Sequence, residues 1–163
     1  MPHHSQPHPC TLCNAHNSLF PNPLHPHVLS KDQFTRWLTP FGIDHMNGLT
    51  EFFPPHLIAM SHILISKSVT PLTLSNYASG LLRFTKFCND YKIPESFRMP
   101  ASEALLTMFI TCCTTASVSS LTLWHWVLGL ELWHEINGAP WLSCSTLKWA
   151  VKVVNLLPPI YLS

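Results

Sequence analysis

Charged side chains are scarce in this sequence. Only 10% of the 163 residues are Asp, Glu, Lys or Arg, against about a quarter in ordinary domains. Nine basic residues are balanced by eight acidic ones, so the net charge gives no support to nucleic-acid binding, and any such site must be a local patch. Because 47% of the residues are hydrophobic, we expect a sticky surface, which a partner or a missing neighbouring domain would explain.

Signals of export and of membrane insertion are also missing. The N-terminus, MPHHSQPHPC, has no apolar run of the kind that a secretory signal needs. The 27 residues between Glu103 and Glu131 carry no formal charge, but their Ser/Thr-rich centre predicts two buried helices and no membrane span. The cysteines form no obvious disulfide framework, so we expect an intracellular protein with reduced thiols at Cys10, Cys13, Cys88, Cys112, Cys113 and Cys144.

Familiar catalytic patterns are absent from the sequence. It has no glycine-rich phosphate loop and no paired carboxylates around an obvious pocket. Glu131, His134 and Glu135 fall within one helical turn, but a histidine near a helix C-terminus is expected from the helix dipole alone. No Arg and His cluster lies near the tyrosines to activate them. We therefore predict no catalytic residue and no cofactor.

The spacing of apolar residues predicts an all-α fold, because no stretch alternates as a strand does. Helices are predicted at residues 33–38, 56–66, 71–91, from about 100, 121–137 and 145–157, with Pro40 and Gly42 ending the first of them. Residues 70–157 are expected to form a compact bundle of four main helices. A short helical extension, 28–69, and an irregular Pro/His-rich tail, 1–27, precede the bundle, and a short tail, 158–163, follows it.

Capping residues mark the ends of the longer predicted helices. Thr70 is a suitable N-cap before Pro71, and Ser119 or Ser120 can cap the helix over 121–137. Gly138 is expected just past the end of that helix. Because the same helix is apolar on more than one side, it belongs in the middle of the bundle. Five tryptophans are predicted to be core anchors: Trp124, Trp126, Trp133, Trp141 and Trp149.

The N-terminal tail contains a weak candidate for a metal site. Cys10, Cys13 and His16 have half of the spacing of a zinc site, and His25 or His27 could supply a further ligand. Strong zinc signals pair two such knuckles, and here there is one. We interpret the segment as a flexible tail with free thiols and predict no metal.

One predicted helix combines an aromatic stripe with a polar face. Tyr77, Leu81, Phe84 and Cys88 recur at intervals of four, three and four. The polar groups that could contact DNA phosphates are Thr73, Asn76, Arg83 and Lys86, with Lys92 just beyond, Ser120 at a later helix start, and Lys148 and Lys152 one turn apart. A merely solvated face is the alternative interpretation.

The stretch TLSNYASGLLRF, residues 73–84, resembles the first helix of the core-binding domain in phage-integrase-type tyrosine recombinases, in particular those of fungal transposable elements. Further similar stretches are LHPHVL (24–29), FC (87–88), IPE (93–95), RMPA (98–101), GL (129–130) and LWHEINGAPW (132–141). The resemblance implies a helical domain that closes over one side of a DNA duplex, opposite a separate catalytic domain.

Departures from the family pattern qualify that expectation. The family's His-x2-Arg box and the rest of its catalytic domain are absent, Leu142-Ser143 stand where His-Gly is common, and Trp149 interrupts the basic run of the last helix. The resemblance thus implies a truncated, non-enzymatic DNA-binding module of the nucleus, with any catalysis supplied in trans. The alternative is a protein-interaction domain or an inert remnant, in which an apolar face would meet a recombinase catalytic domain or a second copy.

Overall fold

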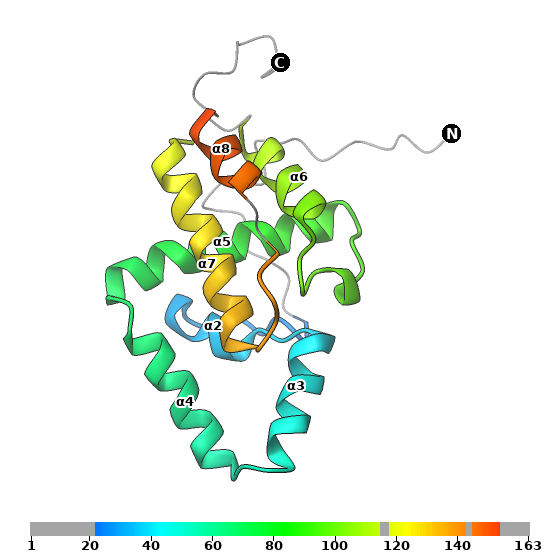
Figure 1. Ribbon diagram of the computed structural model, residues 1–163, viewed down its shortest axis with the longest axis vertical. Coiled ribbons are helices and arrows are strands. Elements are labelled where there is room, and N and C mark those ends of the chain that lie inside the picture. Colours follow the sequence, from blue (N-terminus) through cyan, green and yellow to red (C-terminus); the bar gives the residue numbers. More distant parts are fainter. Residues whose placement is uncertain (1–21, 115–117, 143–144, 154–163) are drawn as a thin grey trace.

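The computed structural model describes residues 22–114, 118–142 and 145–153, and every regular element in these ranges is a helix. The prediction of an all-α fold is confirmed. The elements are the 3-10 helices η1 (Ser30–Asp32) and η2 (Glu95–Phe97) and the α-helices α2 (Gln33–Arg36), α3 (Pro40–Thr50), α4 (Pro55–Lys67), α5 (Pro71–Asp90), α6 (Glu103–Thr114), α7 (Ser120–Ile136) and α8 (Ser145–Val153) (Figure 1).

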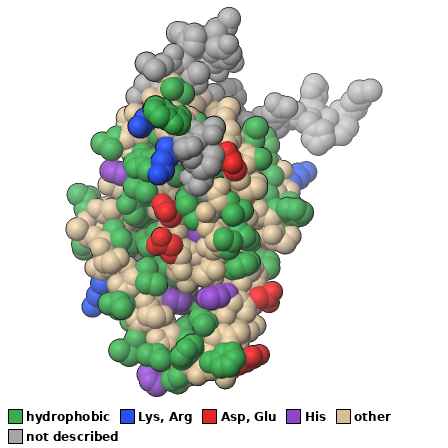
Figure 2. Space-filling view, viewed as in Figure 1, with side chains coloured by type: hydrophobic (Ala, Val, Ile, Leu, Met, Phe, Trp, Pro, Cys, Tyr) green, Lys and Arg blue, Asp and Glu red, His purple; other side chains and the backbone are tan. Residues whose placement is uncertain are grey.

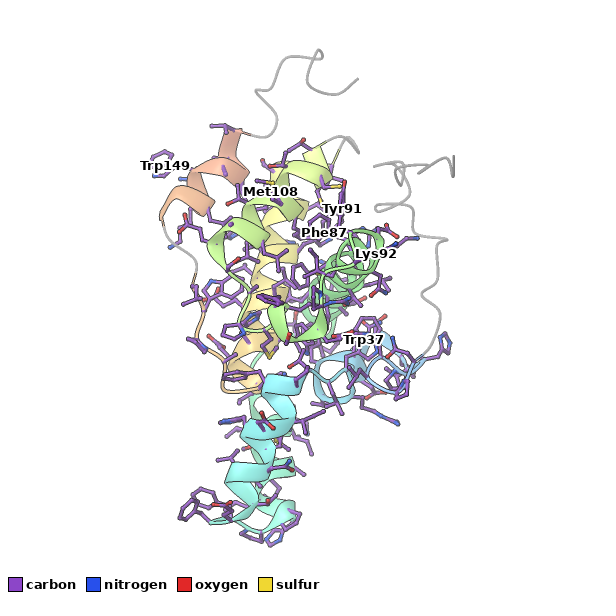
Figure 3. All side chains as sticks on the ribbon, turned by 90° about the vertical axis from the view of Figure 1, so that its right-hand side faces the viewer. Trp37, Phe87, Tyr91, Lys92, Met108 and Trp149 are labelled. Atoms are coloured by element: carbon purple, nitrogen blue, oxygen red, sulfur yellow. The ribbon has the colours of Figure 1, made fainter. Side chains whose placement is uncertain are left out.

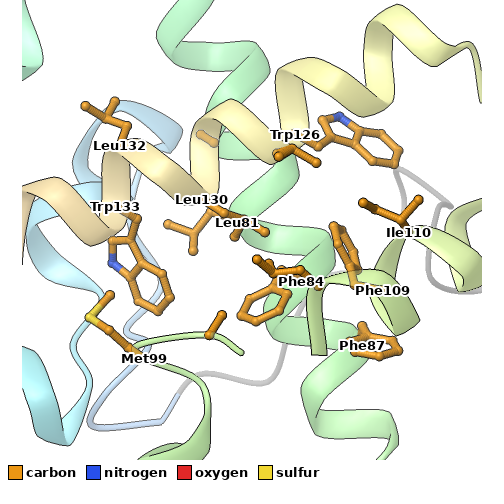
Figure 4. Packing of buried hydrophobic residues seen from close by; sticks show 14 of the residues in the cluster. Leu81, Phe84, Phe87, Met99, Phe109, Ile110, Trp126, Leu130, Leu132 and Trp133 are labelled. Carbon is orange, nitrogen blue, oxygen red and sulfur yellow. The ribbon is translucent and has the colours of Figure 1, made fainter. Parts of the chain in front are cut away.

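The core forms around α7, which α5 crosses, while α6 and α8 pack near one end of α7 and α2 near the other (Figure 1). Figure 4 shows the side chains that fill the crossing: Leu81 and Phe84 of α5, Phe109 of α6, and Leu130 and Trp133 of α7. The rings of Phe84 and Phe109 meet edge to face, with their centroids 5.5 Å apart. The predicted central place of α7 is confirmed, since its buried residues lie on several sides of the helix.

The predicted caps are present on α5 and α7. The Thr70 hydroxyl accepts the N–H of Thr73, and the Ser119 hydroxyl accepts the N–H of Thr122. Gly138 has φ +67°, and the N–H of Ala139 donates to the carbonyl of His134 at 2.9 Å. This is the left-handed turn that glycine allows just past a helix.

The first part of the described chain corrects one prediction. Pro40 does not stop a helix; it begins α3, because Thr39 is an N-cap whose hydroxyl accepts the Gly42 N–H at 3.1 Å. Proline at the first helical position needs no N–H partner. The helix before it ends at Arg36. Phe34 and Trp37 lie in the same core as α5 and α7, so the predicted extension helps to build that core.

Four of the five tryptophans pack on or in the core, but Trp149 is 63% exposed and its prediction as a core anchor is wrong. The reason lies in the spacing of α8. Leu147 and Val151 are four residues apart and both are buried, so residue 149, between them in the sequence, lies on the opposite side of the helix.

No single helix in the described ranges is long and apolar enough to cross a membrane. Together α4 and α5 pass that test by length and composition, but they are bent by 103° at the break between them.

Two glycines let α5 and α7 approach closely. A Cβ on Gly80 would overlap the backbone of Trp126, and a Cβ on Gly129 would overlap the backbone of Tyr77. Because backbone atoms cannot move aside as a flexible side chain can, the crossing requires a residue without a side chain at both positions.

The close approach of α5 and α7 predicts that alanine is destabilising at Gly80, whereas alanine should be stabilising at a glycine outside the crossing. We expect Gly80→Ala to lower the free energy of unfolding by about 1–3 kcal/mol through overpacking. Gly48→Ala in α3 is the control, because nothing lies within 4 Å of a Cβ there, and alanine's helix propensity should raise stability by up to about 1 kcal/mol. Urea denaturation measures both; a Gly80→Ala variant as stable as the wild type would contradict the close crossing.

Candidate nucleic-acid interface

Four of the predicted DNA-contacting residues share one ridge along α5. Thr73, Asn76, Arg83 and Lys86 follow each other at intervals of three, seven and three residues, so successive members are neighbours on the helix surface, but the line turns gradually around the axis and Thr73 and Lys86 are well apart around it. Asn76 is exposed and the other three are half-buried. The hydroxyl of Thr73 also accepts a hydrogen bond from that of Thr70 at 2.8 Å, so Thr73 is part of the helix cap.

Arg83 is fixed by contacts that the sequence did not indicate. Its guanidinium carbon lies 4.4 Å from the centroid of the Trp126 ring, and Nη1 donates to the Ser79 carbonyl at 3.3 Å. A guanidinium on an aromatic face is attracted by the ring, and stacking restricts its orientation. The side chain therefore joins α5 to α7 as well as contributing charge.

Acidic groups lie close to the basic ones. Asp90 follows Lys86 by one turn; burial raises the pKa of its carboxyl, and the Lys86 ammonium opposes that rise. Burial and the neighbouring Glu135 raise the pKa of Glu131, and Lys148 opposes that rise. On the face shown in Figure 2, blue and red side chains accordingly lie near one another below the end that carries α8. The charges of Lys86 and Lys148 are thus partly neutralised by their acidic neighbours.

Three other predicted residues meet in a groove between α7 and α8. Ser120, Lys148 and Lys152 line a cavity of about 450 Å³, together with the apolar side chains of Leu121, Trp124 and Val151. The Lys152 ammonium lies 4.8 Å from the centroid of the exposed Trp149 ring. A hydroxyl at a helix start and two ammonium groups are suitable for an anion, whereas the other side chains that line the groove are apolar.

Lys92 lies apart from the groove beside α8. In Figure 3, Trp149 on α8 and Lys92 at the end of α5 lie on opposite sides of the molecule, with α6 and α7 between the two helices. Lys92 is exposed in the left-handed turn that ends α5, at φ 54°. The structure thus brings together Ser120, Lys148 and Lys152, and separately Thr73, Asn76, Arg83 and Lys86, but leaves Lys92 apart.

Arg98, within the resemblance stretch RMPA, has a structural role. It is buried, its Nε and Nη2 donate to the Ile93 carbonyl at 2.9 and 2.8 Å, and its Nη1 donates to Asn89 Oδ1 at 2.9 Å. Nη1 also lies 3.4 Å from a carboxylate oxygen of Glu95. These bonds fix the turn after α5, so this guanidinium is directed inward.

The weak metal candidate is not assembled within the described ranges. Cys10, Cys13 and His16 lie outside them, and no group of three or more His, Cys, Asp or Glu gathers inside them. His25, considered as a further ligand, is buried against Trp37, with Nε2 3.8 Å from Glu95. Burial and the Arg98 charge lower the pKa of His25 to about 4, so the imidazole is neutral near pH 7 despite the neighbouring carboxylate.

His134 is a buried structural group, which its place near the helix end did not reveal. Its Nδ1 donates to the Leu130 carbonyl at 2.7 Å, and its Nε2 accepts the N–H of Ala101 at 2.9 Å. Burial lowers its pKa to about 4. A proton on Nε2 would remove the acceptor that ties α7 to the segment before α6.

We therefore expect His134 to make the protein sensitive to mild acid. The unfolded state, with a pKa near 6.5, binds a proton that the folded state resists until about pH 4, so stability falls as the pH falls through this window. The contribution of His134 to this loss should be about 2 kcal/mol between pH 7 and 5, and the lowered pKa of the buried His25 adds a loss of the same sign. The raised pKa values of Asp90, Glu95 and Glu131 act in the opposite direction near pH 4–5.

To isolate this contribution, chemical denaturation of the wild type and of His134→Gln is compared at pH 7 and 5. The variant should lose less stability than the wild type over that range. NMR titration of the wild-type imidazole is a second readout, which does not depend on the variant folding. A His134 ring that titrates near pH 6.5 in the folded protein would contradict this interpretation.

Comparison with known proteins adds no relative: no family model, no curated protein and no solved structure matches the chain.

Proposed function

We propose that this chain is a non-enzymatic DNA-binding module, the core-binding part of a truncated tyrosine recombinase, and that it grips duplex DNA through its phosphates. The observation that supports this most is the α5 ridge, in which Arg83 and Lys86 continue a line of neutral donors from Thr73 and Asn76. Phosphate contacts in protein–DNA complexes use this mixture of charged and neutral groups.

Each member of the ridge has a distinct role in the proposal. The guanidinium of Arg83 is held over Trp126, and its planar fork of N–H donors matches the oxygens of a phosphate. Lys86 supplies a point charge one turn further along. The Asn76 amide and the Thr73 hydroxyl would donate neutral hydrogen bonds. A held arginine loses less conformational entropy on binding than a mobile one.

The groove between α7 and α8 supplies a second contact in the proposal. The first turn of a helix presents backbone N–H groups and the positive end of its dipole. At the start of α7 these lie beside Ser120, Lys148 and Lys152. Since α8 packs on α6 and α7 whereas α5 crosses α7, the two contacts would engage separate phosphates.

The neighbouring carboxylates limit the affinity that the proposal predicts. Asp90 lies beside Lys86, and Glu131 lies beside Lys148, so binding should be weak, with a dissociation constant on the order of 10⁻⁴ to 10⁻⁶ M or weaker at physiological salt. Because the proposed contacts are to phosphates, binding should also be sequence-tolerant. Strand breakage would need a catalytic domain in addition to these 163 residues, and the proposed place of action is the nucleus.

A salt titration tests the proposal. Four basic side chains that each neutralise one phosphate give a slope of roughly −3 to −4 in log K against log salt. We expect Lys86→Ala and Lys148→Ala each to flatten the slope by about 0.9. Arg36→Ala on α2 is the matched control, because Arg36 is exposed and lies on a helix outside the proposed interface.

Fluorescence anisotropy with a labelled duplex gives the slopes. If Arg36→Ala changes the slope as much as Lys86→Ala does, the attraction depends on net charge and not on the ridge, and the proposed interface is wrong. Arg83→Ala is unsuitable as the main variant, because it also removes the contact with Trp126.

A second candidate function is a protein-interaction domain or an inert helical remnant. The observation that favours interaction is the number of large apolar side chains that are exposed, among them Phe52 at 80%, Leu64 at 74% and Trp149 at 63%. Surfaces of this kind mark sites of association.

A further inference from the structure

The helix pair α3–α4 projects from the other helices, as both Figure 1 and Figure 3 show. Only one side of α4 faces the protein: Ile58 is buried and Ile65 packs against the core. On the opposite side Leu57, Met60 and Leu64 are exposed, at intervals of three and four residues. An apolar seam with this spacing is typical of a helix that packs against another helix.

The seam is shaped to receive side chains. A shallow groove of about 440 Å³ runs along it, lined by Leu57, Met60, Ser61, Ile63, Leu64 and Lys67. Ser61 is the small residue at its centre, and its hydroxyl donates to the Ile58 carbonyl at 2.6 Å. Because that hydroxyl already has a partner, covering Ser61 would leave no unsatisfied donor.

The exposed apolar surface extends beyond the seam. Phe52 and Phe53 lie in the turn before α4, and Leu72 lies in the first turn of α5, the next helix. With these side chains, the exposed apolar area around α4 is on the order of 600 Å², at the upper end of what a monomer usually shows. It approaches the roughly 800 Å² that each partner buries in a standard-size interface.

We propose that the occupant of this surface is a second copy of the same chain, with the two α4 helices antiparallel about a two-fold axis near Met60 and Ser61. Leu57 of one copy would then meet Leu64 of the other. Lys67 ends α4, and Glu51, the C-cap of α3, lies four residues before Pro55 at the start of α4. The antiparallel arrangement brings each Lys67 toward the partner's acidic end, whereas a parallel one would place two lysines together.

A two-fold contact of this kind closes on itself, so it yields a dimer and not a fibre. The inference is independent of DNA binding, because no residue of the α5 ridge takes part in it.

Two methionines provide a matched test. Met60 on α4 and Met108 on α6 are both 59% exposed, and each stands near the middle of its helix. We expect Met60→Glu to weaken dimerisation by about 100-fold or more, because two like charges would face each other across the axis. Met108→Glu should leave the dimerisation constant unchanged. Sedimentation equilibrium of the full chain without DNA measures both.

The sedimentation experiment would overturn the proposal if it showed a wild-type chain that is monomeric at all concentrations, a dimer that Met60→Glu does not weaken, or equal weakening by Met108→Glu. A photo-crosslinking benzoylphenylalanine at position 60 gives a second readout. We expect a product of twice the chain mass, linked to α4 of the other copy. A cross-link within one chain, or binding of a monomer to phosphatidylcholine vesicles, would assign the surface to another occupant and contradict the dimer.

Lys86→Ala, which tests DNA binding, should not change the dimerisation constant.

Discussion

The close contact between the backbones of α5 and α7 is the constraint on which the rest of the fold depends. Gly80 faces Trp126, and Gly129 faces Tyr77, so neither crossing point has room for a side chain. This approach brings Leu81 and Phe84 against the buried face of α7. It also fixes α7 as the element on which α2 and α8 pack, and hence determines where the groove beside α8 lies.

The same crossing connects the polar ridge of α5 to the core. Trp126 occupies the position opposite Gly80, and its ring supports the guanidinium of Arg83. A side chain at the helix surface is thereby tied to the core. The ridge nevertheless carries Asp90 at its end, and the α8 lysines have Glu131 nearby. The proposed interface is therefore ordered but only moderately positive, and its affinity should depend on geometry as much as on charge.

Features set by adjacent residues could be predicted from the sequence, and features set by distant ones could not. The caps at Thr70, Ser119 and Gly138 follow from local chemistry, and all three are present. The start of α3 is local too: Thr39-Pro40 is the same signal as Thr70-Pro71, and the predicted stop at Pro40 is wrong because it neglects that signal. By contrast, the exposure of Trp149 depends on which side of α8 meets α6 and α7. The burial of His25 and His134 depends on partners far along the chain, namely Trp37, Arg98 and Ala101.

Chemical-shift mapping with a short duplex tests the central claim most directly, because it reports which residues approach DNA. With backbone amides assigned, the account predicts that addition of duplex at low salt shifts the signals of Asn76 and Lys86 on α5 and of Ser120 and Lys148 around the groove. Signals of α4 should stay in place at a fixed protein concentration. Shifts confined to α3 and α4, or none at DNA concentrations well above 10⁻⁴ M, the weak end of non-specific binding, would contradict it.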